Sequence, residues 1–232
     1  MWTDRTEKLI GPAAVKRLAA SSVLVFGLGG VGSYAVEALA RAGIGRLGLC
    51  DFDRIDDTNR NRQLYALTST VGQLKVEVAK ERLLDINPDI KLDLYPLFYG
   101  PDTGIPIDEY DFVVDAVDNV TAKLLLAQRA PRIISSMGTG NKLDPEKLKI
   151  ADIYETSVCP LARVMRRELR AREITHLTVV YSTETPVATF ADAPGSMSFV
   201  PPAAGMLMAS YVIRQLISTA SEMKNIERSE DL

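Results

Sequence analysis

The sequence predicts an α/β fold of the Rossmann-like type, a mostly parallel sheet with helices on both faces and a C-terminal elaboration. Short apolar segments alternate with amphipathic ones, a glycine-rich loop joins the first such pair, and the alternation changes after residue 145. Such alternation is typical of parallel strands joined by crossover helices. We therefore expect a single domain over residues 1–232, with a core at 1–145 and an elaboration at 146–232.

Composition excludes several classes of protein. Hydrophobic residues make up 47% and charged residues 25% of the 232 residues, which is ordinary for a globular chain. The longest apolar candidate, 203–217, contains Arg214, and the N-terminus is charged, so we expect neither a membrane span nor a signal peptide. Two cysteines and one histidine exclude a disulfide framework and a four-cysteine zinc site, and they indicate a reducing, cytoplasmic location.

Local patterns place the individual elements. Apolar or alternating segments predict strands at 23–26, 46–50, 92–95, 112–117 and 132–135. Amphipathic segments predict helices at 33–41, 73–86 and 121–129, the second ending before Asn87-Pro88. In the elaboration we expect strands at 149–154 and 177–181 with an arginine-rich helix between them. A long loop at 185–202, a last helix at 203–219 and a polar tail at 221–232 follow.

The glycine-rich loop at 27–32 lies between a predicted strand and a predicted helix, which is the context that the dinucleotide fingerprint requires. Gly27 allows the tight turn, Gly29 lets the backbone approach a phosphate, and Gly32 lets the helix pack on the sheet. The helix N-terminus attracts an anion. Asp51 ends the second strand, 19 residues after Gly32, where a carboxylate suits a ribose hydroxyl. Glycines kept only for a tight turn are the alternative.

The segment after Asp51 favours ATP over NAD. Asn59, Arg62 and Lys75 follow within 24 residues of Asp51. An NAD site needs no further cations beyond its glycine loop, whereas cations beside a nucleotide suit a triphosphate whose oxygens must be held and neutralised.

Asp118 follows another strand, and strand carboxyl ends face the ligand crevice in such sheets. Its carboxylate suits Mg²⁺, a hard cation that prefers oxygen ligands. Two structural alternatives stay open. Arg62 can pair with Asp53 or Asp56 at the surface, and Asp118 can cap the next helix.

Taken together, these motifs resemble the E1-like (ThiF/MoeB/HesA) adenylate-forming family over residues 5–145. The resemblance rests on the glycine loop, the segment from Asp51 to Gln63 with its Asn59 and Arg62, the lysine, and the Asp-Ala-Val-Asp-Asn strand end at 115–119. It implies that ATP and Mg²⁺ are the cofactors. It also implies that a carboxylate attacks the α-phosphate of ATP, releasing pyrophosphate and leaving an acyl-adenylate.

The resemblance also implies residue roles. Catalytic roles fall on Asp118, Arg62, Lys75 and Arg5, with Asp118 as the metal ligand. Arg5 would act across a homodimer; the second basic residue of that family stretch is Lys8 here. The implied nucleotide-binding residues are Gly27, Gly29, Gly30, Gly32, Asp51, Asp53, Asn59, Arg62, Gln63 and Lys75.

Within this superfamily the chain resembles the tRNA threonylcarbamoyladenosine dehydratase branch, through residues 5–11, 66–72, 135–145, 156–162 and 195–203. The Cys-x-x-Cys pairs common in enzymes of ubiquitin-like sulfur carriers are absent. The resemblance implies adenylation of the threonine carboxylate of N6-threonylcarbamoyladenosine in tRNA, then ring closure with loss of water. The alternatives are an adenylyltransferase for a sulfur-carrier protein, a non-catalytic nucleotide-binding partner and, more distantly, an NAD oxidoreductase. A sulfur-transfer partner also stays open.

An arginine-rich segment supports an RNA partner independently. Residues 163–172 carry five arginines and one glutamate, a local charge of +4 in a chain of net charge −3. A helix would bring four of them to one face and suit RNA phosphates; we call Arg163, Arg166, Arg167 and Arg170 the arginine stripe. A solvated face paired with Glu168 and Glu173 is the alternative.

Several reactive residues receive a structural interpretation. Cys159 precedes a proline and the arginine-rich helix, and we favour a structural role over a reactive one. Cys50 ends an apolar strand and is expected in the core, and His176 is expected at the surface. Gly138 and Gly140 follow a strand and can admit the substrate closely.

Overall fold

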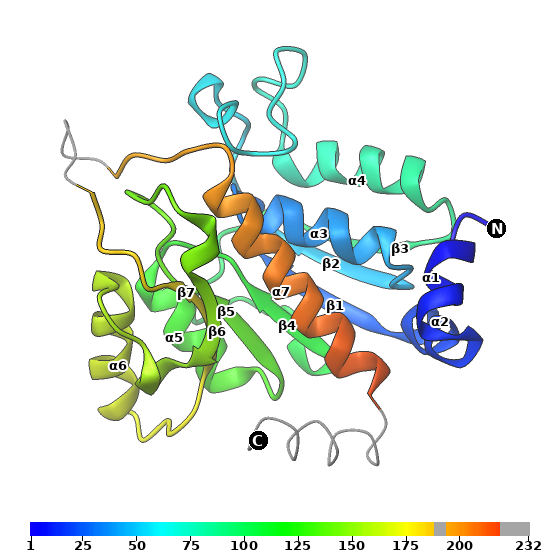
Figure 1. The fold of residues 1–232 in the computed structure, drawn as a ribbon. Helices are drawn as coiled ribbons and strands as arrows, with labels where there is room; N and C mark the ends of the chain where they lie inside the picture. Colours follow the sequence, from blue (N-terminus) through cyan, green and yellow to red (C-terminus); the bar gives the residue numbers. More distant parts are fainter. Residues whose placement is uncertain (188–193, 219–232) are drawn as a thin grey trace.

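In residues 1–187 and 194–218, which the computed structural model describes, seven strands form one sheet in the order β3-β2-β1-β4-β5-β7-β6 (Figure 1). Every neighbouring pair is parallel except β6 and β7, so the predicted mostly parallel sheet is confirmed. The strands are β1 (Ser22–Phe26), β2 (Arg46–Cys50), β3 (Lys91–Tyr95), β4 (Phe112–Asp115), β5 (Ile133–Ser136), β6 (Leu148–Asp152) and β7 (Thr178–Ser182).

Helices cover both faces of the sheet, as the sequence predicts. On one face α7 packs along α3 across the middle of the sheet, and α4 lies beside α3 (Figure 1). The opposite face carries α5 and α6. The helices are α1 (Asp4–Ile10), α2 (Pro12–Ala20), α3 (Gly32–Arg41), α4 (Lys75–Ile86), α5 (Val120–Arg129), α6 (Pro160–Arg170) and α7 (Val200–Ile217).

Strand β1 shows why its sequence is apolar at every position. Val23 and Val25 point into the core beneath α3 and α7, whereas Leu24 and Phe26 point into the core beneath α5. All four side chains are fully buried. A central parallel strand covered on both faces therefore reads as a continuous hydrophobic run.

Several element boundaries differ from the sequence-based expectation. The predicted strand 112–117 ends at Asp115, because the Asp115 carboxylate accepts the Val117 N–H and turns the chain. The predicted strand 149–154 ends at Asp152, which caps a short 3-10 helix, Ile153–Glu155. Helix α4 begins at Lys75 rather than at residue 73. The N-terminal helices α1 and α2 were not anticipated.

The last helix begins three residues earlier than predicted. Helix α7 starts at Val200 because prolines fit the first turn of a helix, where no N–H partner is needed. The predicted loop at 185–202 therefore ends before Val200, and its residues 188–193 lie outside the described residues. The same holds for residue 219 of the predicted helix and for the predicted tail at 221–232. No helix in the described chain is long and apolar enough to cross a membrane.

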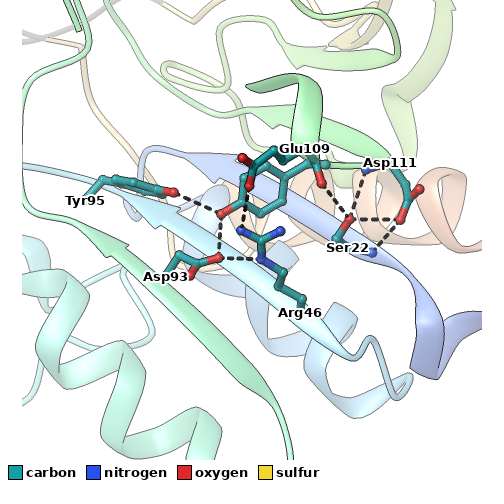
Figure 2. A network of polar contacts seen from close by, with 7 residues as sticks. Ser22, Arg46, Asp93, Tyr95, Glu109 and Asp111 are labelled. Carbon is teal, nitrogen blue, oxygen red and sulfur yellow. Dashed lines mark hydrogen bonds and ion pairs between the residues drawn. The ribbon is translucent and has the colours of Figure 1, made fainter. Parts of the chain in front are cut away.

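A polar network ties the three strands β1, β2 and β3 to the segment before β4 (Figure 2). Arg46 Nε donates to Asp93 at 2.6 Å, and the Tyr110 hydroxyl donates to the same carboxylate oxygen at 2.7 Å. The Arg46 guanidinium lies 4.5 Å from the centre of the Tyr110 ring. A Cβ at Gly48 would lie 2.7 Å from the Tyr110 hydroxyl, so this strand position needs glycine. Burial and contacts with Tyr95 and Asp93 raise the pKa of the Tyr110 phenol.

Candidate nucleotide-binding site

A cavity of about 520 Å³ opens at the carboxyl ends of β1, β2, β4 and β5. Its walls come from the residues that directly follow those strands, including Gly27, Asp51, Ala116 and Met137. The strand order reverses direction between β1 and β4, and ligands bind at such switch points in open α/β sheets. The sheet thus places the sequence-predicted residues of distant segments around one space.

The glycine loop has the backbone that its sequence predicts. Gly27 has a φ of +87°, and a Cβ there would lie 2.6 Å from the Ala116 carbonyl oxygen. A Cβ at Gly32 would lie 1.8 Å from the Gly27 carbonyl oxygen, so the start of α3 can pack only with glycine. A Cβ at Gly29 would meet only the Gln63 amide nitrogen, at 3.9 Å. This part of the loop therefore leaves room for a ligand.

The N-terminus of α3 faces the cavity without a side-chain cap. The first N–H groups of a helix have no partner within the helix, and the helix dipole places partial positive charge there. An anionic group in the cavity can therefore accept hydrogen bonds from these N–H groups.

Asp51 serves both the loop and the cavity. One carboxylate oxygen accepts the Leu28 N–H at 2.6 Å, and the other accepts the Asp53 N–H at 2.8 Å. The residue is 8% exposed and lines the cavity. Burial raises the pKa of Asp51, although the Lys75 ammonium and the two N–H groups oppose that rise. Asp51 thus fixes the glycine loop relative to β2, and part of its side chain faces the cavity.

Lys75 is held by two carboxylates at the start of α4. Its Nζ lies 2.7 Å from Asp53 and 3.7 Å from Asp51, and the residue is only 4% exposed. The ammonium therefore faces the cavity in a fixed position, and its charge is shared by the two acids. An entering polyphosphate would find this cation already oriented.

Arg62, Gln63 and Asn59 come from the segment that follows β2, and all three line the cavity. Arg62 Nη1 donates to the Thr58 carbonyl at 3.0 Å and to the Asn61 side chain at 2.9 Å. The Asn59 side chain accepts the Asp56 N–H at 3.1 Å. The surface-pairing alternative for Arg62 is wrong, because in the described chain no carboxylate contacts its guanidinium.

Asp118 lies on the cavity wall beyond β4 and is exposed. The capping alternative for Asp118 is wrong, because Asn119 caps α5 by accepting the Ala122 N–H at 3.0 Å. Within residues 1–187 and 194–218, the Asp118 carboxylate makes no hydrogen bond or ion pair. The same residues contain no cluster of three or more His, Cys, Asp or Glu side chains suited to a metal ion. A hard cation here would thus rely on Asp118 together with phosphate and water oxygens, which fits Mg²⁺.

Two phenylalanines at the cavity rim were missed in the sequence. Phe52 and Phe98 make an edge-to-face pair with ring centres 5.4 Å apart, and each is about half exposed at 53% and 52%. Phe52 directly follows Asp51 in the chain, and both rings line the cavity. An aromatic surface of this kind can contact a flat heterocycle.

The far half of the cavity is built from the segment after β5. Gly138 and Gly140 line it, as predicted, and a Cβ at Gly140 would lie 3.0 Å from Pro194. Asn141, with a φ of +58°, accepts the Gly195 N–H through its side chain and the Val187 N–H through its carbonyl. This residue thereby binds Val187 and Gly195, of which Gly195 lines the cavity.

The arginine stripe forms on α6, but its members differ in their contacts. Arg166 is committed to Thr156, whose carbonyl and hydroxyl it contacts. Arg167 pairs with Glu168 at 2.8 Å, and Arg170 lies 5.1 Å from the centre of the Tyr154 ring. Arg163 is exposed at the cavity end of α6. The alternative of a solvated helix face paired with acids therefore holds for Arg167, which pairs with Glu168.

The cysteines and the histidine occupy the places that their sequence context suggested. Cys159 is 2% exposed at the start of α6, and Cys50 is 3% exposed in the core. Burial, and to a lesser extent Asp51, raises the pKa of the Cys50 thiol to about 12. His176 is exposed and lies 2.5 Å from Asp152.

Arg5 does not line the cavity of its own chain. It is exposed on α1, and the adjoining α2 ends two residues before β1 begins. This is the amino end of the strands, opposite the cavity (Figure 1). Arg5 could therefore act on a cavity only if that cavity belonged to another subunit.

A sequence profile of the ThiF family matches residues 3–228. The chain belongs to the ThiF family. A Bacillus subtilis member named tRNA threonylcarbamoyladenosine dehydratase is 39% identical over 97% of this chain and 97% of its own length. The crystal structure of the Escherichia coli tRNA N6-threonylcarbamoyladenosine dehydratase in complex with ATP is 31% identical, covers 94% of each chain and has a TM-score of 0.85. A Thermus thermophilus sulfur carrier protein adenylyltransferase is 37% identical, but over only 52% of this chain and 45% of its own.

Proposed function

We propose that this ThiF-family chain is an ATP-dependent tRNA threonylcarbamoyladenosine dehydratase. The observation that carries the proposal is that one cavity joins a cationic half beside the glycine loop to a second half that reaches the start of α6. The first half suits a polyphosphate, and the second lies next to an arginine-rich surface that suits RNA. Similarity to the Bacillus subtilis dehydratase over nearly the whole of both chains supports the choice of substrate.

The reaction needs two bond exchanges. A carboxylate oxygen of the threonyl group attacks the α-phosphorus of ATP, and the bond to pyrophosphate breaks. The carbamoyl group of the same nucleoside then attacks the activated carbonyl carbon, and AMP leaves with its electron pair. The net result is a ring and the loss of one water. Because both reacting groups belong to one nucleoside, orientation in the cavity supplies much of the rate.

The cavity residues divide the work by charge. Lys75 and Arg62 neutralise the phosphates, and Asn59 and Gln63 supply neutral polar groups beside them. Asp51 accepts a ribose hydroxyl, while the glycine loop and the N-terminus of α3 take phosphate oxygens. Mg²⁺, held by Asp118, would add charge neutralisation as pyrophosphate departs.

Further parts of the proposal concern assembly and location. We expect a cytoplasmic homodimer in which Arg5 of one subunit completes the cavity of the other, because Arg5 is exposed and remote from its own cavity. The arginine stripe would hold tRNA phosphates, and Asp53 would keep Lys75 in place. A sulfur-transfer partner would be a further, separate interaction.

The deciding experiment incubates the protein with ATP, Mg²⁺ and tRNA that carries N6-threonylcarbamoyladenosine. Mass spectrometry of the digested nucleosides should show loss of one water from the modified base, with one AMP released per product. A parallel reaction supplies a sulfur-carrier protein ending in Gly-Gly in place of tRNA. AMP formation with that carrier alone would reject the proposal, and so would an Asp118→Ala variant with unchanged turnover.

A further inference from the structure

A lysine that does not line the cavity connects two of its walls. Lys123 of α5 is fully buried, and its Nζ contacts both carboxylate oxygens of Asp115, at 3.2 and 3.1 Å. The same ammonium donates to the Ser136 carbonyl at 2.7 Å and lies 3.2 Å from the Ser135 hydroxyl. Ser135 in turn donates to Asp115 at 2.5 Å. One buried ammonium therefore links the carboxyl ends of β4 and β5, through an ion pair with Asp115 and a hydrogen bond to the Ser136 carbonyl.

Both of these strand ends continue directly into the cavity. The Asp115 carboxylate also accepts the Val117 N–H at 3.2 Å, which shapes the turn that carries Asp118. Ser136, whose carbonyl binds Lys123, is followed by Met137 and Gly138 on the far wall. Lys123 therefore connects to the turn that carries Asp118 through the Asp115 carboxylate and the Val117 N–H. On the other side it connects to the far wall through the Ser136 carbonyl.

Burial of an ion pair is a poor way to stabilise a fold, because removing two charges from water offsets most of their attraction. An apolar pair would fill the same space between α5 and the sheet at little loss. What an apolar pair cannot do is bind the Asp115 carboxylate and the Ser136 carbonyl, which lie where the backbone ladder between β4 and β5 ends. The buried cation is therefore better explained by the position of the two cavity walls than by stability.

We propose that Lys123 is a positioning residue, which sets Asp118 for Mg²⁺ and holds it in register with the wall at 136–138. The inference rests on the proposed magnesium role of Asp118. It predicts that Lys123 affects how much Mg²⁺ strengthens the binding of ATP, rather than ATP binding itself. Lys75 and Arg62 share no hydrogen bond with Lys123, Asp115, Ser135 or Ser136, so we expect them to bind the phosphates of ATP as before.

The test is calorimetric titration of ATP into the full-length protein, with and without Mg²⁺. We expect Lys123→Met to bind ATP without Mg²⁺ within about threefold of the wild type. The gain in affinity on adding Mg²⁺ should shrink by about tenfold. An unchanged gain in a folded Lys123→Met protein would overturn the inference.

Asp118→Asn is the reference that separates this inference from the proposed function. Loss of the magnesium-dependent gain in Asp118→Asn supports the metal role of Asp118 whatever Lys123→Met does. If Asp118→Asn keeps the gain, the magnesium assignment itself fails. If Asp118→Asn loses it and Lys123→Met keeps it, only the positioning role of Lys123 fails.

Folding is controlled by two further variants. The double variant Lys123→Met, Asp115→Asn leaves no buried charge unpaired, yet it still lacks the link to Ser136, and we expect the same reduced gain. Glu37→Gln breaks another ion pair, on α3, and should lower stability while leaving the magnesium-dependent gain intact. An equal loss in Glu37→Gln would show that the gain follows stability alone. Failure of both Lys123 variants to fold would assign the network to the fold, and either result overturns the inference.

Discussion

The Lys75 ammonium lies 2.7 Å from a carboxylate oxygen of Asp53, at a cavity that the glycine loop and Arg62 also line. Asp53 is partly exposed, whereas Lys75 is almost fully buried. A buried lysine paired with a carboxylate is held in place before the ligand arrives, so less ordering is required when ATP binds.

Replacing Lys75 by methionine should weaken ATP binding by about tenfold to a hundredfold. A hydrogen bond to a charged group contributes roughly 1.5–3 kcal/mol, and the variant also leaves Asp51 and Asp53 to repel the phosphates. Titration calorimetry with ATP measures the change. Lys80→Met, an exposed lysine on the same helix, is the matched control and should bind ATP like the wild type. Equal affinity in both variants would contradict the phosphate role of Lys75.

A Gly27→Ala substitution should destabilise the protein by about 3 kcal/mol or more. It places an L-residue at a φ of +87°, and its Cβ would lie 2.6 Å from a backbone oxygen. Gly72→Ala offers the comparison, because Gly72 has the same φ of +87° with nothing within 4 Å of its Cβ. It should cost only about 1 kcal/mol. Urea denaturation measures the free energy of unfolding of both variants and so separates the cost of backbone strain from the cost of the close contact. An equal loss of stability in the two variants would contradict the close contact at Gly27.

The free energy of unfolding should fall at acidic pH, and part of this fall should be absent in Glu37→Gln. Burial raises the pKa of Glu37, but hydrogen bonds from Arg82 and Arg41 outweigh it, so the folded-state pKa is below the usual value. The ion pair therefore contributes stability above the unfolded pKa, and this contribution disappears as the pH falls through the folded pKa. We expect the wild type to exceed Glu37→Gln by about 1–2 kcal/mol near neutral pH.

Chemical denaturation at a series of pH values tests this expectation. The difference between wild type and Glu37→Gln should shrink steadily below about pH 4.5, the ordinary range of a glutamate. Glu77→Gln, an exposed acid on α4, should show no such trend. A constant difference across the whole series would mean that Glu37 acts through packing and not through its charge.

Changes in the arginine stripe should alter tRNA binding according to how each arginine is paired. Arg163→Gln should weaken tRNA binding and lower the slope of log affinity against log salt by about one, as for one lost phosphate contact. Arg172, which follows the stripe, pairs with Glu168 at 2.9 Å, so Arg172→Gln should weaken tRNA binding less than Arg163→Gln does. Filter binding over a range of KCl concentrations measures both. Identical salt slopes for wild type and Arg163→Gln would argue against a phosphate contact at Arg163.

The glycine loop, the strands and the main helices could be predicted because their signals are local. A run such as 23–26 is apolar for reasons that hold within the segment itself, and Asp51 and Asp118 could be placed because they follow such runs. The sheet order then brought them together, as the rule for parallel strands requires. The first two helices are short, and α1 has no buried residue to mark it, whereas the Gly11-Pro12 start of α2 is a helix signal that the sequence analysis did not use.

The rest of the site depends on contacts between distant segments. Phe52 and Phe98 are 46 residues apart, and only the pairing of β2 with β3 places them side by side. Lys123 reads as an ordinary polar position on an amphipathic helix, and nothing in the local sequence indicates that its ammonium is enclosed. The helical spacing of the arginines placed Arg166 on one face with the others. The spacing could not reveal that the Arg166 guanidinium donates to the Thr156 carbonyl.

The contact between Gly30 and Pro201 has a consequence for synthesis of the chain. A Cβ at Gly30 would lie 3.0 Å from the Pro201 side chain, so the nucleotide loop is packed by a helix that the ribosome makes much later. The loop therefore gains its final support only after Pro201 has left the ribosome. We expect nascent chains that stop before α7 to be poor ATP binders.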